Sequence, residues 1–134
     1  LMGELASAAL EAGAEVTGVE PQFFVDSVLQ LEGLTRLIVT PDMAQRKAKM
    51  IELGDAFVAF PGGTGTLEEI SQIISMIGLG QLDAPCVFYN LNGYYNPMAE
   101  QLDRMLACDL TSPERLQGIS FARNLDELVA CLQA

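Results

Sequence analysis

The sequence predicts an α/β protein with a doubly wound parallel sheet and helices on both faces. Short apolar runs alternate with amphipathic helical patterns along the chain, which is typical of strands joined by crossover helices. Residues 56–60 are continuously apolar, as in a strand buried on both faces. A glycine-rich loop then leads directly into a helical pattern, at the edge where such sheets bind ligands. With 134 residues, half of them apolar, we expect a single domain over 1–134.

In the N-terminal part, small and apolar residues share one face of a helix expected over 2–12, which Gly13 ends. Strands are expected over 14–19 and 35–39. The segment between them, 21–34, is ambiguous and holds either a short helix or a loop. Because the chain opens on a helix, as though an earlier strand had been removed, we expect an N-terminally incomplete domain.

The central part has the clearest boundaries. Asp42 is a suitable N-cap for a helix over Met43–Leu53, and Gly54 ends that helix. A strand follows over 55–60, and a helix over 67–79 comes after the glycine loop.

The remaining elements alternate in the same way. We expect them over 84–89 (strand), 97–107 (helix), 119–121 (strand) and 124–132 (helix). Asn124 and Glu127 resemble a capping box at the last helix. Residues 90–93 carry Asn-Gly turn chemistry and lead into Tyr94 and Tyr95. Either tyrosine could stack on a base, although packing at a loop or subunit surface is the favoured interpretation.

Composition excludes several function classes. A net charge of −11 argues against binding to nucleic acid or to anionic membranes. No apolar run is long enough to span a membrane. The absence of histidine excludes Ser-His and Cys-His nucleophiles and histidine-based metal sites, so acid–base chemistry falls to other side chains. We expect no metal and no organic cofactor.

Cys86, Cys108 and Cys131 are widely spaced and form no C-x-x-C pair. An odd number of cysteines in strand-like and helical segments indicates buried thiols in a reducing cytoplasm.

The stretch 61–69 predicts an anion site. A loop almost without side chains would direct the free N–H groups and the positive end of a helix dipole at a ligand. Two glutamates in the first helical turn would repel a phosphate unless cations are brought from elsewhere. Only seven basic residues exist, and Arg46, Lys47 and Lys49 are clustered. Arg46 and Lys47 fall in the first two turns of their helix, so we expect them to reach the mouth of the loop.

Structural alternatives remain for these residues. Thr66 and Glu69 have the spacing of a capping box, and acidic residues near a helix start are favoured by its dipole. Gly62, Gly63 and Gly65 could simply make a tight connection. The basic cluster could be a solvated helix face.

The loop lacks the G-x-x-x-x-G-K-[ST] pattern of P-loop ATPases and the G-x-G-x-x-G pattern of dinucleotide sites. Phosphate-binding amides, cations and carboxylates together suit cleavage of the N-glycosidic bond of a nucleoside monophosphate. The phosphate would anchor the substrate, and a carboxylate would stabilise an oxocarbenium-like sugar or activate water.

Residues 43–47 and 61–69 resemble the paired M-x-x-R-K and P-G-G-x-G-T-x-E-E motifs of the Lonely Guy (LOG) family. Residues 1–3 are similar to the end of that family's G-G-x-x-G-L-M-G segment. The family consists of phosphoribohydrolases that release cytokinin bases from riboside 5′-monophosphates. The resemblance covers essentially the whole chain and implies a Rossmann-like fold and a homodimer. It implies hydrolysis of a cytokinin or purine nucleoside 5′-monophosphate to free base and ribose 5-phosphate.

Many family members carry a lysine decarboxylase label. Two features argue against it here: Lys47 and Lys49 are the only lysines, and the sequence contains no strong pyridoxal-phosphate pocket.

The resemblance implies that Arg46 and Glu69 form the catalytic pair. Glu69 would face the anomeric carbon, and Arg46 would neutralise phosphate or support the departing base. The substrate-binding residues that it implies are Met43, Lys47, Gly62, Gly63, Thr64, Gly65, Thr66, Glu68 and Ser75. The preferred base, and which of the two glutamates does the chemistry, stay open.

The chain departs from the family pattern at several positions. Ala44 replaces a common histidine, Ser75 and Met76 replace a common Thr-Trp pair, and a further family glutamate has only Asp26 or Glu32 as its nearest match. The alternative function is a non-catalytic nucleotide or molybdopterin carrier, because related Rossmann-like carriers share the glycine loop without needing the Arg-Glu pair.

Overall fold

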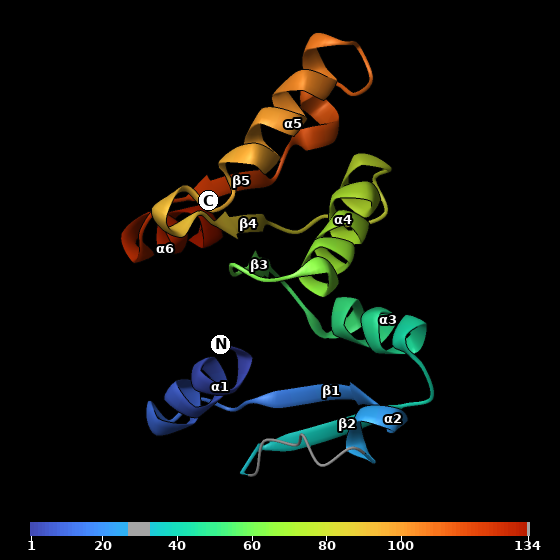
Figure 1. Ribbon diagram of the computed structural model, residues 1–134, viewed down its shortest axis with the longest axis vertical. Coiled ribbons are helices and arrows are strands. Elements are labelled where there is room, and N and C mark those ends of the chain that lie inside the picture. Colours follow the sequence, from blue (N-terminus) through green and yellow to red (C-terminus); the bar gives the residue numbers. More distant parts are fainter. Residues whose placement is uncertain (27–32, 134) are drawn as a thin grey trace. The chain divides into compact units, whose positions relative to one another are not determined.

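The computed structural model of the protein describes residues 1–26 and 33–133. It consists of two compact units, the first ending at Leu53 and the second beginning at Gly54. Each unit holds parallel strands flanked by helices, which confirms the α/β class and the parallel strand direction (Figure 1). The described strands form two separate sheets, one in each unit.

The first unit is built around a two-stranded sheet. Its elements are α1 (Met2–Glu11), β1 (Thr17–Pro21), α2 (Gln22–Val25), β2 (Arg36–Thr40) and α3 (Met43–Leu53). The strands pair in register from Thr17 opposite Arg36 to Pro21 opposite Thr40. Helix α3 packs against both strands.

Most of the expected boundaries in this unit are confirmed. Helix α1 is followed by Gly13 with φ +82°, a left-handed conformation that glycine adopts without strain. Asp42 Oδ1 accepts a hydrogen bond of 2.8 Å from the Gln45 N–H, so Asp42 caps α3 as predicted. This bond, given to the charged form, is the main cause of the lowered pKa of the Asp42 carboxyl.

Strand β1 lies further along the chain than expected. The prediction over 14–19 was wrong by up to three residues, because pairing with β2 sets the register and begins at Thr17. Just before it, the Val16 N–H donates 2.9 Å to Thr35 Oγ1 instead of joining a ladder. The short helix within the ambiguous 21–34 segment is α2. Residues 27–32, Glu32 among them, lie outside the described residues.

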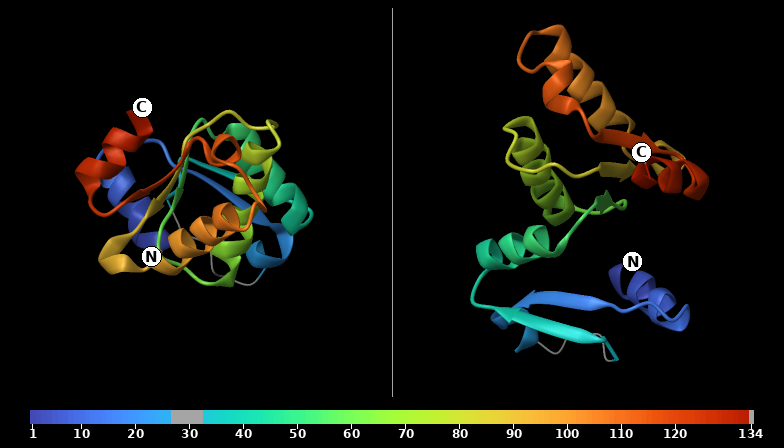
Figure 2. Two further views of the ribbon diagram at one scale, coloured as in Figure 1. Left: turned by 90° about the horizontal axis from the view of Figure 1, so that it is seen from above. Right: turned by 180° about the vertical axis from the view of Figure 1, so that it is seen from behind.

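The second unit is built around a three-stranded parallel sheet of order β3-β4-β5. Its elements are β3 (Phe57–Ala59), α4 (Thr64–Gly78), β4 (Cys86–Tyr89), η1 (Leu91–Gly93), α5 (Asn96–Ala107), η2 (Pro113–Leu116), β5 (Ile119–Ala122) and α6 (Leu125–Gln133). Helix α6 packs against β4 and β5, beside which it lies in the second unit (Figures 1 and 2).

Central strand β4 is buried on both of its faces. Val87 lies with Ala122 and Leu128 in one apolar cluster, on the side of α6. The neighbouring Phe88 points to the opposite face, where its ring stacks on Phe121 at a centroid separation of 4.8 Å. This explains why the strand is continuously apolar instead of alternating.

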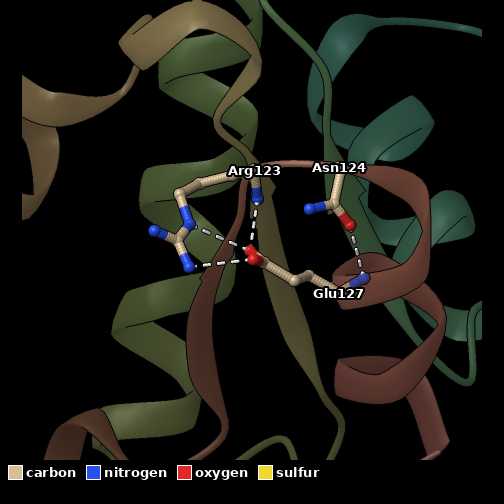
Figure 3. A network of polar contacts seen from close by, with 3 residues as sticks. All are labelled: Arg123, Asn124 and Glu127. Carbon is tan, nitrogen blue, oxygen red and sulfur yellow. Dashed lines mark hydrogen bonds and ion pairs between the residues drawn. The ribbon is translucent and has the colours of Figure 1, made fainter.

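The start of α6 carries a polar network (Figure 3). Asn124 Oδ1 accepts from the Glu127 N–H at 2.9 Å, which confirms the predicted N-cap. The Glu127 carboxylate reaches back to the N–H of Arg123, at 2.8 Å, instead of that of Asn124, and pairs with the Arg123 guanidinium at 2.9 Å. The guanidinium hydrogen bond is the main cause of the lowered pKa of Glu127.

The expectation of three buried thiols was wrong for Cys108. Cys86 is fully buried in β4, whereas Cys108 is exposed just after the end of α5, and Cys131 is half-buried. All three are free thiols. Among the helices in the described part of the chain, none is long and apolar enough to cross a membrane.

Candidate functional site

The glycine loop connects the end of β3 to the start of α4. Helix α4 begins at Thr64 with Gly63 as N-cap, and within the described residues no side chain caps it. The Leu67 N–H makes the first intrahelical bond, 3.1 Å to the Gly63 carbonyl oxygen. The N–H groups of Thr64, Gly65 and Thr66 therefore precede that bond, at the positive end of the helix dipole. This arrangement suits an anion.

Two of the three loop glycines have no structural need to be glycine. A Cβ atom on Gly63 or Gly65 would meet nothing within 4 Å among the described residues. Gly63 has φ −90°, which any residue can adopt, and Gly65 lies within the helix. The space beside these two residues is therefore open, next to the amides of the helix start.

The two glutamates lie in the second turn of α4, not in the first. Because the helix starts at Thr64, the capping box proposed for Thr66 and Glu69 was wrong, and the first turn holds no acidic residue. The capping-box interpretation of Glu69 is therefore removed.

The two glutamates point in different directions from the helix. Ile70 and Ile73 are buried and mark the core face of α4. At about 100° per residue, Glu68 lies nearly opposite that face and Glu69 lies on its flank, in agreement with exposed Glu68 and half-buried Glu69. Glu69 is one turn after Gly65 and Thr66, and helical side chains tilt toward the N-terminus. The Glu69 side chain thus leans toward the start of the helix.

Ser75 is not brought to the loop within this unit. It is exposed on the same side of α4 as Glu68. It lies about 14 Å along the helix axis from Thr66, at ~1.5 Å rise per residue.

Tyr94 and Tyr95 bind the main chain of the loop. The Tyr95 hydroxyl donates 2.6 Å to the carbonyl oxygen of Phe60, and the Tyr94 hydroxyl donates 2.5 Å to that of Gly62. Burial, and secondarily the neighbouring Tyr94, raise the pKa of Tyr95, so its hydroxyl remains a donor at neutral pH. Sequence reasoning had favoured packing for this pair. One sequence signal could have indicated these contacts with the loop: the Asn-Gly turn places two tyrosines shortly after a strand.

Arg46 is held within the first unit by β1. It lies in the first turn of α3 and is half-buried, and its Nε donates 2.8 Å to the carbonyl oxygen of Val19. Met43, the first residue of the helix, and Lys47 are also half-buried. Lys49 instead forms an ion pair of 2.7 Å with Glu52 on the same helix. The solvated-face interpretation of the basic cluster therefore fits Lys49.

A cavity of about 450 Å³ lies within the first unit, and Arg46 contributes to its wall. Most of the lining is apolar, with Phe24 and Met50 among the larger side chains. Glu20 is the acidic residue in the lining. Sequence reasoning missed Glu20, because it lies just after the strand expected over 14–19 and belongs to no motif. Asp26, a candidate for the further family glutamate, is exposed and accepts 3.0 Å from Gln22 Nε2.

Parallel strands joined by helices, with a glycine loop opening a helix at the carboxyl end of a strand, define a Rossmann-like α/β protein. The sequence profile of the family described as "Possible lysine decarboxylase" matches residues 2–132. The chain belongs to this family.

Curated relatives are similar over the full chain. A cytokinin riboside 5′-monophosphate phosphoribohydrolase of Rhodococcoides fascians is 38% identical over 135 residues, covering 100% of this chain and 68% of the relative. The enzyme of that name called LOG5 in Arabidopsis thaliana is 37% identical over 134 residues, covering 100% of this chain and 59% of the relative. LOG3 of the same plant is 36% identical over 133 residues, covering 99% and 62%. The chain thus spans between 59% and 68% of these three relatives.

Proposed function

We propose that this protein hydrolyses the N-glycosidic bond of a cytokinin or purine nucleoside 5′-monophosphate. The products are the free base and ribose 5-phosphate. One observation carries the proposal: an uncapped helix start beside open space at Gly63 and Gly65, in a chain similar to named phosphoribohydrolases. A phosphate in that space would accept hydrogen bonds from the first-turn amides.

The substrate phosphate supplies the anchoring energy in this proposal. Amide groups at Gly63, Thr64, Gly65 and Thr66 bind its oxygens, and the absence of side chains at the glycines permits close approach. Gly62 lets the Thr66 side chain pack against the loop. Arg46 and Lys47 neutralise the anion or support the departing base. Met43 and Ser75 contact the substrate further from the phosphate.

Glu69 acts at the anomeric carbon. The bond between that carbon and the base nitrogen breaks, and the electron pair leaves with the base, which takes up a proton. The developing oxocarbenium is stabilised by the carboxylate, and a water oxygen bonds to the same carbon while its proton is lost. The half-buried flank position and the lean toward the helix start support Glu69 over Glu68 for this task. We assign Arg46 and Glu69 to one substrate because the two motifs that contain them resemble the paired motifs of the LOG family.

A lysine decarboxylase would need a different site. The present protein has two lysines. Lys49 forms an ion pair with Glu52, and Lys47 follows Arg46 on α3. A carrier that binds a nucleotide or molybdopterin without reaction is the other alternative, and the following experiment separates it from the enzyme.

Free base is measured chromatographically after incubation of the intact protein with nucleoside 5′-monophosphates. The panel includes AMP and isopentenyladenosine monophosphate, with Glu69→Gln as control. Base release that disappears in the control supports the hydrolase and identifies the base. Tight nucleotide binding without release, unchanged by Glu69→Gln, would instead support the carrier.

We further propose that the protein acts as a homodimer in the cytoplasm. The resemblance to the LOG family supports the dimer, and three free thiols suit a reducing compartment. Light scattering after size exclusion would detect the dimer, and a monomer at micromolar concentration would contradict it.

A further inference from the structure

Two adjacent tyrosines hold the glycine loop by its main chain. Their partners, the carbonyl oxygens of Phe60 and Gly62, lie 35 and 32 residues away in sequence. Phe60 and Gly62 flank Pro61, and Gly62 immediately precedes the helix N-cap Gly63. The tyrosines therefore restrain the segment whose amides face the open space at the start of α4.

The bond from Tyr94 has a directional consequence for the loop. In a trans peptide the carbonyl and the following N–H point in opposite directions, and the described chain has no cis peptide. When the Gly62 carbonyl points to the Tyr94 hydroxyl, the Gly63 N–H points away from it. A hydrogen bond accepted by that carbonyl also polarises the same peptide, which makes its N–H a stronger donor.

The tyrosine pair is itself firmly supported. Tyr95 is buried, and its ring packs edge-on against Phe88 at a centroid separation of 4.9 Å. Its N–H donates 2.6 Å to Asn90 Oδ1, and Asn90 Nδ2 donates 2.8 Å to Asn96 Oδ1. The Tyr94 ring packs against that of Tyr95 at 5.0 Å. The hydroxyls are therefore fixed relative to β4 and not only to the loop.

We propose that Tyr94 and Tyr95 are positioning residues for the phosphate site, and that Tyr94 orients the Gly63 N–H toward the substrate phosphate. The inference rests on the proposed function, because it assumes that the loop binds a phosphate. It assigns no contact between either tyrosine and the substrate.

Removal of single hydroxyl groups tests this proposal. Tyr94→Phe is the principal variant, since Tyr94 is half exposed and its ring contact is kept. Tyr89→Phe is the matched control. The Tyr89 ring also lies beside the loop, 5.5 Å from that of Phe60, but its hydroxyl has no hydrogen-bond partner among the described residues. Tyr95→Phe removes the second bond and also leaves the part-buried Phe60 carbonyl with one partner fewer, so the Tm of this variant should fall by a few degrees.

Calorimetry compares the affinities of each variant for AMP and for adenosine, which lacks the phosphate, with Glu69→Gln added to every protein so that the proposed hydrolysis does not consume AMP. In Tyr94→Phe, AMP affinity should fall about five- to tenfold while adenosine affinity stays unchanged. In Tyr89→Phe both affinities should match the wild type. Equal losses for the two ligands, or no loss for AMP, would overturn the inference, because a merely structural effect does not select the phosphate.

This readout is independent of catalysis. A wild type that prefers AMP to adenosine but releases no base would refute the proposed hydrolysis, and the tyrosine comparison would still decide the inference. A wild type without preference for AMP would overturn the inference directly.

Discussion

Gly62 and Thr66 lie so close together that a Cβ atom on Gly62 would be 2.9 Å from Thr66 Cβ. Real Cβ atoms do not approach that closely. Rotation of the Thr66 side chain about χ1 would not relieve this contact, because that rotation leaves Cβ in place. Glycine is thus required by packing at position 62, whereas the described protein offers no such reason at Gly63 or Gly65. Substitutions at the loop glycines are therefore expected to have different effects.

Gly65→Ala should separate stability from function. Alanine is the better helix former by up to about 1 kcal/mol, and its methyl group would enter open space. Unfolding by urea should show unchanged or increased stability, while KM for the nucleotide should rise at least tenfold as the methyl obstructs the amides. An unchanged KM would mean that no ligand approaches Gly65.

Gly62→Ala should have the opposite pattern. The added methyl would displace Thr66 or the loop, which lowers the free energy of unfolding, typically by about 1–3 kcal/mol for overpacking. The same urea titration measures it. A stable Gly62→Ala protein would show that the contact with Thr66 relaxes easily.

Glu69→Gln should lower kcat by about 10²-fold or more, while KM stays within several-fold, because the carboxylate serves the transition state. Glu68→Gln is the matched control, with the same change on the adjacent, exposed residue. Rates of base release at saturating substrate give the comparison. A larger loss in Glu68→Gln would reverse the assignment of the two glutamates.

The boundaries that could be predicted are those with local causes. Helix α3 has the expected range Met43–Leu53 because Asp42 caps it and Gly54 follows it. The start of α4 was misplaced because Thr66 and Glu69 have the spacing of a capping box, while the actual N-cap, Gly63, has no side chain to identify it. Strand β1 was misplaced because its ends depend on a partner strand distant in sequence.

The candidate site residues of the two units show the same division between local and distant causes. The glycine loop and Arg46 stand in short motifs and could be recognised directly. The hydroxyl contacts of Tyr94 and Tyr95 join residues more than 30 positions apart, which no local pattern encodes. Which acidic residue shares the cavity lining with Arg46 likewise depends on tertiary packing.

Asn124→Ala should destabilise the protein by about 1 kcal/mol, because the Glu127 N–H loses its N-cap partner. Thermal or urea unfolding measures this loss. Asn124→Asp should retain most of the stability, since a carboxylate accepts the same bond and favours the helix dipole. Equal losses in both variants would contradict a capping role.

Acid should weaken the fold partly through Glu127. Its pKa is lower in the folded state than the reference value of 4.5, so the folded state binds the proton less readily than the unfolded chain. The contribution to stability is therefore complete above about pH 4.5 and is lost as the pH falls through the folded pKa. In Glu127→Gln, the free energy of unfolding should decline less steeply below that pH. A slope equal to that of the wild type would contradict the linkage.

The cysteines should differ in reactivity toward a disulfide reagent. Burial raises the pKa of Cys86 to about 12 and also shields it, so it should react only as the protein unfolds. Exposed Cys108 should react rapidly in the native state. Absorbance of the released thiol would follow both phases, and Cys108→Ser should remove the fast one. Persistence of that phase in the variant would place the reactive thiol elsewhere.

The bonds from Tyr94 and Tyr95 end on main-chain oxygens, which every amino acid supplies. Mutations that change the side chain of Phe60 leave the acceptor atom present, whereas loss of either tyrosine hydroxyl removes its donor. Over evolutionary time the two sides of this contact should accordingly vary at different rates. The loop can exchange side chains at such positions, while the tyrosines preserve the direction of its peptide groups.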